Sequence, residues 1–261
     1  YGIILNKEKI GNDLKSFNLI SNLKNKGIKI FNEIEWYEIY VNRIPTELLN
    51  KDISYYHYLK FKKTNIQFRI KRLGDLFLSI IILFITLPII FISGILIFLE
   101  DKGPIFYSQI RTGFGGKKFK IIKLRTMAIN AERNGVRWSQ NSDSRITKIG
   151  KILRKLRFDE LPQLISVIKG EMSLIGPRPE RPELEIDLLD SIPHYYLRYE
   201  QLPGLSGWAQ VNYPYGASLE DSKNKLGFDL FYICNYSLKM DLFILFKTMR
   251  TVFSGKGSTP G

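Results

Sequence analysis

The stretch LFLSIIILFITLPIIFISGILIFL, residues 76–99, contains no charged side chain and has one proline, Pro88, near its middle. About 20 consecutive apolar residues are enough to cross a bilayer as an α-helix. A buried helix of a water-soluble protein rarely stays uncharged over such a length. The sequence therefore predicts a membrane helix over about residues 73–99.

Basic residues flank this stretch on both sides. They are Lys60, Lys62, Lys63, Arg69, Lys71 and Arg72 before it, and Lys102, Arg111, Lys117, Lys118, Lys120, Lys123 and Arg125 after it. A spanning helix normally carries its basic excess on the cytoplasmic side only. Here both flanks are basic, which predicts that both ends of the helix lie on the cytoplasmic side. A proline removes a helical hydrogen bond and bends the helix. The two features together favour a re-entrant helix that turns at Pro88 and returns. An ordinary single span with a tolerated proline is the alternative.

The composition limits the class of protein and its partners. The 261 residues carry a formal net charge of +14, which predicts an anionic partner such as lipid headgroups, nucleic acid or a phosphorylated substrate. The single cysteine, Cys234, excludes an internal disulfide and a multi-cysteine metal cluster. Two histidines, His57 and His194, leave little material for a His-rich zinc site or a His-based triad.

Residues 1 to about 65 differ from the rest of the chain. Apolar runs at 2–5 and 27–31 enclose a stretch with helical spacing at 14–25, which indicates a partial β/α pattern without a Gly-rich phosphate loop. The chain begins at Tyr1 rather than methionine. We expect a fragment or a processed form of a longer protein.

After the membrane segment, apolar/basic alternation across residues 118–124 predicts a short hairpin that turns at 113–116. Residues 146–169 have helical spacing, interrupted at Pro162, which fits the first turn of a new helix. The first part is basic and amphipathic, and it suits either an anionic membrane surface or packing on protein. Residues 226–248 are aromatic and apolar with interspersed charge, which predicts an interfacial amphipathic helix.

Asp159 and Glu160 are adjacent carboxylates at the predicted break, within a basic stretch. Such a pair can converge on one site, where one carboxylate attacks and the other handles a proton or shares a metal. An acidic pair that caps a helix is the simpler alternative. Nearby cations and a helix N-terminus favour the ionised form of Asp159 and attract phosphate.

Several cations are candidates for binding phosphate or carboxylate groups. Arginine binds phosphate through two parallel hydrogen bonds, whereas lysine acts as a point charge. Prolines around two of these arginines, in the loop GPRPERPE, limit the entropy that is lost when the loop is ordered. The candidates are Lys123, Arg125, Arg145, Arg178 and Arg181.

Four segments together resemble the bacterial sugar transferase family, the monotopic polyprenyl-phosphate phosphoglycosyl transferases. They are FYSQIRTGFGGKKFKIIKLRTM, RITKIGKILRKLRFDELPQLISVIKGEMSLIGPRPERPE, YEQLPGLSGWAQVNY and CNYSLKMDLFILFKT. The resemblance covers about residues 68–253. Many relatives have Ser-Pro at the kink, where this chain has Leu87-Pro88, so Thr86 or Ser93 would have to supply the helix-breaking hydrogen bond.

The resemblance implies an α+β fold, seated on the membrane by the re-entrant helix and interfacial helices, with a short β-hairpin. Residues 67–261 would form the catalytic domain. Residues 1–66 look like the tail of a degenerate nucleotide-fold domain and a linker, as in long-form members, whose N-terminal transmembrane bundle is absent from this sequence. Self-association of such members makes a homodimer an expectation. The location would be the cytoplasmic face of the bacterial inner membrane.

The resemblance also implies a reaction: transfer of a sugar-1-phosphate from a UDP-sugar to polyprenyl phosphate, with Mg²⁺ required. Asp159 would attack the β-phosphate, and Glu160 would act as a base or through the metal, so both are candidate metal ligands. Gln210 and Trp208 would shape the nucleotide end of the site, although Trp208 fits a packed core equally well.

Other functions fit the sequence less well. A nucleic-acid-binding protein would need a helix-turn-helix or an aromatic-basic platform, and the sequence shows neither, so no nucleic-acid partner is expected. One hydrophobic segment excludes the many-span class of phosphoglycosyl transferases. A catalytically silent scaffold of polysaccharide assembly with the same fold remains the alternative.

Overall fold

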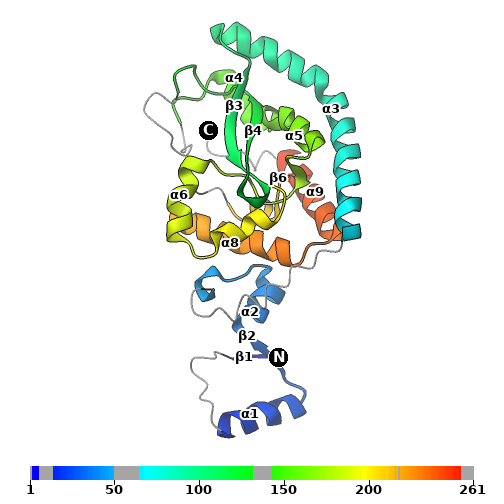
Figure 1. The fold of residues 1–261 in the computed structure, drawn as a ribbon, viewed down its shortest axis with the longest axis vertical. Helices are drawn as coiled ribbons and strands as arrows, with labels where there is room; N and C mark the ends of the chain where they lie inside the picture. The colour runs from blue at the N-terminus through cyan, green and yellow to red at the C-terminus, as the bar shows by residue number, and fades with distance from the viewer. Residues whose placement is uncertain are drawn as a thin grey trace.

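The structure is a computed structural model of the chain, and it describes residues 2–5, 14–49, 65–131, 143–214, 216 and 218–253. Figure 1 shows a small N-terminal unit below a larger body, with one long helix along the side of that body. The architecture mixes helices with three two-stranded sheets. It confirms the α+β class.

The N-terminal unit is a β-α-β arrangement. β1 (Gly2–Leu5) pairs in parallel with β2 (Lys29–Asn32), and α1 (Leu14–Asn25) connects the two strands. This confirms the β/α pattern predicted from the apolar runs. α2 (Glu33–Trp36) follows directly, with an N-terminal capping box between Asn32 and Glu35, and a π-helical turn, η1 (Tyr37–Val41), continues it.

Residues 42–49 form a strap that belongs to the core of the larger body. The strap includes a short 3-10 helix, η2 (Thr46–Leu48). The side chains of Ile44 and Leu49 are buried in the main hydrophobic cluster. The backbone N–H of Ile44 donates to the carbonyl of Gly227, at 3.0 Å. The N-terminal region is therefore joined to the larger body by packed apolar side chains as well as by the chain itself.

α3 (Asn65–Asp101) is long and apolar enough to cross a membrane. It is a single α-helix of 37 residues with Pro88 inside it, and Figure 1 shows it bending as it passes along the body. Pro88 deprives the carbonyl of Phe84 of its helical donor. The hydroxyl of Thr86 donates to the carbonyls of Ile82, at 2.7 Å, and Leu83, at 3.3 Å, a type of contact that bends helices.

The predicted helix-break-helix is therefore wrong in its local geometry, because α3 is one helix that continues through Pro88. Thr86 does make a hydrogen bond at this place, as expected, but it binds the preceding turn rather than the carbonyl of Phe84. A smooth bend suffices because the helix loses only one backbone hydrogen bond at Pro88.

Both ends of α3 contact the same body. Near the start, the Arg72 guanidinium donates to the carbonyls of Val167, at 2.6 Å, and Ile168. Near the end, the Glu100 carboxylate accepts a hydrogen bond from the backbone N–H of Lys148, at 2.8 Å. The middle of the helix leaves large apolar side chains exposed, among them Phe77, Phe84, Ile85, Phe91 and Ile92.

The predicted hairpin is confirmed. β3 (Phe106–Thr112) pairs antiparallel with β4 (Lys118–Leu124), and the partners run from Phe106 with Leu124 to Thr112 with Lys118. The turn between them contains a short 3-10 helix, η4 (Phe114–Gly116). Gly115 and Gly116 both have positive φ, a conformation that glycine adopts without strain.

The basic helix predicted from residue 146 is α4 (Lys148–Lys155). It is followed by a 3-10 helix, η5 (Phe158–Gln163), and by α5 (Leu164–Lys169). β5 (Ser173–Ile175) then pairs in parallel with β6 (Gly204–Ser206). Between these two strands lie α6 (Pro182–Ser191) and a 3-10 helix, η6 (Tyr195–Glu200).

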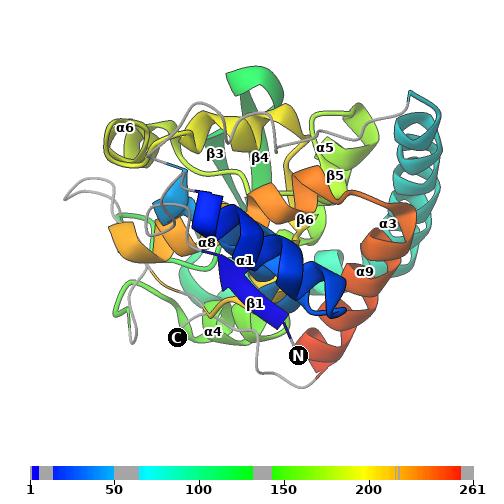
Figure 2. The same cartoon turned by 90° about the horizontal axis from the view of Figure 1, so that it is seen from below.

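The C-terminal part contains α7 (Trp208–Asn212), α8 (Leu219–Cys234) and α9 (Leu238–Phe253). The prediction of one interfacial helix over 226–248 is wrong, because the chain turns at residues 235–237 and the two halves have different surroundings. The second half of α8 is buried in the main core. α9 exposes Leu242, Phe243, Phe246 and Met249, and Figure 2 shows it along the same side of the body as α3.

A glycine pair tests the packing of the strap on α8. A Cβ at Gly227 would overlap the carbonyl oxygen of Ile44, whereas a Cβ at Gly74 of α3 would meet nothing. We expect Gly227→Ala to lower the free energy of unfolding by about 1–3 kcal/mol through overpacking. Gly74→Ala should be neutral or should raise it by up to about 1 kcal/mol, because alanine is the better helix former.

Thermal unfolding of both variants in lipid nanodiscs measures this difference. If the two substitutions change the free energy of unfolding equally, the strap does not pack on α8 as described.

Candidate active site

The predicted break between the helices is where Asp159 and Glu160 lie. α4 ends at Lys155, Leu156 is its C-cap, and Arg157 adopts the left-handed conformation, with φ 56° and ψ 23°. This residue redirects the chain into η5, which carries both carboxylates and Pro162. The α-helix resumes at Leu164 rather than at Pro162, because the residues between are wound as a 3-10 helix. Both acidic side chains are buried.

The Glu160 carboxylate holds three cations. Its Oε1 atom lies 2.6 Å from Nη2 of Arg178 and 3.1 Å from Nζ of Lys123, and its Oε2 atom lies 3.4 Å from Nη1 of Arg157. These cations come from three different segments: the loop after β5, strand β4 and the end of α4. Although burial opposes the charge, the cations hold the pKa of Glu160 well below its usual range.

Asp159 has a different environment. Its side chain is only 9% exposed. Burial, together with the neighbouring Glu160 charge, raises its pKa to about 6, while Lys123, Arg154 and Arg178 act in the opposite direction. The prediction that nearby cations favour the ionised form of Asp159 is therefore wrong, because burial and the Glu160 charge outweigh them. At neutral pH Asp159 is ionised, but it is less stabilised by ion pairs than Glu160. Two adjacent carboxylates thus differ in basicity because of their surroundings.

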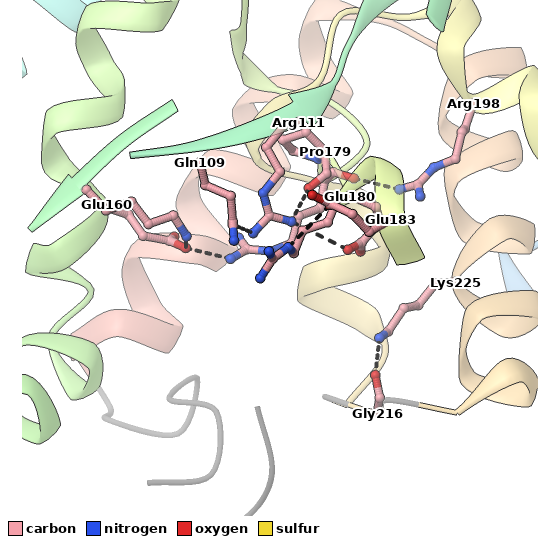
Figure 3. A network of polar contacts seen from close by, with 12 residues as sticks. Gln109, Arg111, Glu160, Pro179, Glu180, Glu183, Arg198, Gly216 and Lys225 are labelled. Carbon is pink, nitrogen blue, oxygen red and sulfur yellow. Dashed lines mark hydrogen bonds and ion pairs between the residues drawn. The ribbon is translucent and has the colours of Figure 1, made fainter. Parts of the chain in front are cut away.

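A further arginine lies beside this cluster. Arg111, from β3, donates to the carbonyl of Pro179, at 3.1 Å, and lies 3.7 Å from the Glu180 carboxylate. Figure 3 shows it between Glu180 and Glu160, close to the loop that carries Arg178. Burial lowers the pKa of Arg111, with Arg178 and Arg181 adding to the effect. A concentration of positive charge favours the binding of an anionic group.

Three of the predicted cations have other acidic partners. Arg125 binds the Asp101 carboxylate with two nitrogens and also donates to the carbonyl of Pro104. Arg145 pairs with Asp143, at 2.6 Å, and Arg181 lies 3.6 Å from Glu183. Of the five predicted cations, Lys123 and Arg178 are the two that the structure brings to Glu160.

Trp208 is a core residue. It stacks on Phe231, with ring centroids 5.9 Å apart, and its indole N–H donates to the carbonyl of Asn42, at 2.9 Å. Gln210 donates to the carbonyl of Leu205, at 3.3 Å, while its own side-chain oxygen is buried without a hydrogen-bond partner among the described residues.

The sequence did not single out Arg157, Arg154 or Arg111 as site residues. The helical spacing of the sequence puts Arg157 on the basic surface of the amphipathic helix, and its left-handed conformation has no sequence signal in a non-glycine residue. Arg111 lies in the hairpin, where apolar/basic alternation is equally typical of a solvated strand face. The structure shows that Arg157 pairs with Glu160 and that Arg111 pairs with Glu180, beside the cluster.

The residues present are compatible with a Mg²⁺ ion. Mg²⁺ is commonly held by one or two carboxylates together with substrate phosphates and waters, and Asp159 and Glu160 supply two adjacent carboxylates. Among the described residues, no group of three or more acidic, histidine or cysteine side chains forms a complete protein cage. Substrate phosphates would have to complete the coordination.

Comparison with known proteins identifies the family of the region that contains this site. Residues 66–255 match the family described as bacterial sugar transferase. The chain belongs to this family. The match includes α3, the hairpin and the acidic pair, and it leaves the N-terminal β-α-β unit outside.

Three similar proteins have names that refer to sugar-phosphate transfer or to exopolysaccharide production. A protein of Aeromonas hydrophila named UDP-N-acetylgalactosamine-undecaprenyl-phosphate N-acetylgalactosaminephosphotransferase is 44% identical over 190 residues, which is 72% of this chain and 45% of that protein. A Caulobacter vibrioides protein named UDP-glucose:undecaprenyl-phosphate glucose-1-phosphate transferase is 37% identical over 186 residues, 70% of each chain. The exopolysaccharide production protein ExoY of Sinorhizobium fredii is 37% identical over 203 residues, 72% of this chain and 87% of that protein. The chain thus spans less than half the length of the Aeromonas relative.

The raised pKa of Asp159 predicts a stability that depends on pH. Because its folded pKa lies near 6 and its usual value near 3.8, ionisation of Asp159 destabilises the fold. This cost is complete above pH 6 and disappears as the pH falls below about 4. Asp159→Asn removes the cost, so we expect it to raise the free energy of unfolding by on the order of 2 kcal/mol at pH 8 and by about half as much at pH 5.

Thermal or denaturant unfolding at the two pH values measures this difference. The control is Asp187→Asn, which changes an exposed side chain of α6. It should change the free energy of unfolding little at either pH. A gain for Asp159→Asn that is the same at pH 5 and pH 8 would contradict the environment described for Asp159.

Proposed function

We propose that this chain transfers a sugar-1-phosphate from a UDP-sugar to polyprenyl phosphate at the membrane surface, through a covalent aspartyl intermediate. The observation that carries the proposal is the pair of Asp159 and Glu160, buried among three cations in a member of the sugar transferase family. The names of the relatives support the general reaction, since several contain both undecaprenyl phosphate and a sugar phosphate.

In the first step, the Asp159 carboxylate attacks the β-phosphorus of the UDP-sugar. A bond forms between a carboxylate oxygen and that phosphorus, the bond to the bridging oxygen breaks, and UMP leaves with the electron pair. Asp159 is suited to this step because it is ionised at neutral pH and is more basic than an ordinary aspartate. The product is an aspartyl-phosphosugar.

In the second step, a phosphate oxygen of polyprenyl phosphate attacks the same phosphorus. The bond between phosphorus and the Asp159 oxygen breaks, the carboxylate is regenerated, and the product is a polyprenyl-diphospho-sugar. We assign the neutralisation of the negative charge that develops in both steps to Lys123, Arg157 and Arg178, because all three pair with Glu160.

Glu160 is better suited to an electrostatic role than to general-base catalysis. A carboxylate whose pKa is held low by three cations is a weak proton acceptor at neutral pH. We therefore assign Glu160 to orienting those cations and, with Asp159, to holding Mg²⁺. When bound, Mg²⁺ would neutralise charge on the diphosphate.

We further propose that α3 is re-entrant. A straight α-helix of 37 residues is about 55 Å long, yet α3 bends and contacts the same body through Arg72 near one end and Glu100 near the other. A helix that crossed the bilayer would place part of this body in the hydrocarbon. Entry and exit through one face keep the body in water, on the cytoplasmic side by the charge argument.

The reaction is tested by UMP release in nanodiscs, with undecaprenyl phosphate, Mg²⁺ and a panel including UDP-N-acetylgalactosamine and UDP-glucose. We expect wild-type protein to release UMP and Asp159→Asn to lose about a thousandfold or more of that rate. Wild type incubated with the UDP-sugar alone should gain the mass of one sugar phosphate on the peptide that contains Asp159.

Asp187→Asn is the matched control and should retain the wild-type rate. Release that persists in Asp159→Asn would overturn the covalent mechanism. No release from folded wild-type protein with any sugar of the panel would favour the non-catalytic scaffold.

Topology is tested with single cysteines at Arg69 and Lys102, which are exposed at the two ends of α3. The native Cys234 is buried, so background labelling should be low. A re-entrant helix predicts that a membrane-impermeant maleimide labels both positions in inside-out vesicles and neither in intact spheroplasts. Labelling of the two positions from opposite sides would show that α3 spans the membrane.

A further inference from the structure

The loop that carries Arg178 is held by an unusual set of hydrogen bonds. It runs from Gly176 to Arg181 without regular secondary structure, and Pro177 and Pro179 have no N–H to donate. The loop must therefore be fixed mainly through its carbonyl groups.

Four consecutive carbonyls of this loop each accept a hydrogen bond. The backbone N–H of Gly204 donates to Pro177, at 2.8 Å, and that of Thr112 donates to Glu180, at 3.1 Å. The two carbonyls between them accept from side chains instead. Arg198 donates to the carbonyl of Arg178, at 2.7 Å, and Arg111 donates to that of Pro179, at 3.1 Å.

Arg198 is itself fixed from several directions. It is 7% exposed, and its guanidinium lies 3.0 Å from the carboxylate of Asp229, which is 2% exposed on α8. Another nitrogen of the same guanidinium donates to the Tyr195 hydroxyl. Because the planar guanidinium must serve Asp229, Tyr195 and the loop carbonyl at once, its orientation is determined by the core and not by solvent.

We propose that Arg198 and Asp229 are positioning residues that set the backbone of Arg178, and thereby aim its side chain at Glu160 and at the diphosphate. The chain of contacts runs from Asp229 through Arg198 to the carbonyl of Arg178, and from the Arg178 guanidinium to Glu160, at 2.6 Å. Arg198 and Asp229 touch no reacting atom in this arrangement. The catalytic part of the inference rests on the proposed function, while the positioning itself does not.

The inference explains why a charged pair is kept in the core. Two buried ionised groups are costly to desolvate, and a hydrophobic pair of similar size is often as stable. An apolar pair could not donate to the carbonyl of Arg178, which would then lose the hydrogen bond from Arg198. The charged pair of Arg198 and Asp229 therefore adds a directional hydrogen bond to the Arg178 carbonyl that an apolar pair would lack.

Arg198→Lys tests the inference, because lysine keeps the charge but cannot donate in three fixed directions. We expect kcat/KM for UMP release to fall about 10-fold, as for a small misplacement of a catalytic group. In an Arg178→Lys background, the same substitution should reduce kcat/KM less than about 2-fold, because the group that it positions is already altered. Equal reductions in both backgrounds would overturn the proposal and leave Arg198 with a purely structural role.

A second measurement does not depend on activity. Phenylglyoxal reacts with accessible arginines, and the rate at Arg178 is read by peptide mass spectrometry. We expect Arg198→Lys and Asp229→Asn to increase that rate severalfold, since Arg178 is released from Glu160. Asp229→Asn is the more conservative change and keeps the test informative if the lysine variant does not fold.

The matched control is Lys71→Arg, a charge-conserving exchange in the buried pair that Lys71 forms with Asp241, at 2.8 Å. It should leave the labelling rate of Arg178 unchanged. An unchanged rate in both Arg198→Lys and Asp229→Asn would overturn the positioning role, whether or not the wild type releases UMP. If the two variants change the labelling rate of Arg178 but the wild-type protein releases no UMP, the positioning role is supported and only the proposed function is contradicted.

Discussion

The neutralisation of Glu160 is the interaction on which the site depends. A buried carboxylate is costly unless it is paired, and here three cations from separate segments pair with it. The hairpin, the end of α4 and the loop after β5 are thereby drawn to one point. With Asp159 the cluster holds two carboxylates and three cations, so one positive charge remains. This excess positive charge would attract an anionic group such as a diphosphate.

The cluster is tied to the long apolar helix α3 by buried polar contacts. The Asp75 carboxylate of α3 accepts a hydrogen bond from the Ser173 hydroxyl, at 2.7 Å, and β5, which begins at Ser173, leads directly into the loop of Arg178. Lys71, one turn earlier, pairs with Asp241 of α9. Apolar packing alone tolerates sliding between helices, whereas these directional contacts fix the register. The height of the site above the apolar face of α3 is therefore set by hydrogen bonds.

Local chemistry made much of this fold predictable, and long-range partners account for what was not. The hairpin followed from alternation and a glycine turn, and the break before Glu160 followed from Pro162. The pairing of Arg125 with Asp101 could not be predicted from local sequence, because Asp101 is 24 residues away and belongs to α3. α8 was misjudged for a related reason: a run of aromatic and apolar residues shows that a face is buried but not whether protein or lipid covers it. The positive φ of Arg157 has no sequence signal at all.

The division of labour between the adjacent carboxylates follows from their surroundings. Ion pairing lowers the basicity of Glu160, and burial raises that of Asp159. The better-paired group is the poorer nucleophile, because attack would require it to give up its cations. The same cations can be shared with an incoming diphosphate without leaving the cluster, since each reaches Glu160 from a different segment. In the proposed mechanism, substrate binding would loosen the pairing of Glu160 and Asp159 would attack, so the charges that hold the resting site together would also stabilise the transition state.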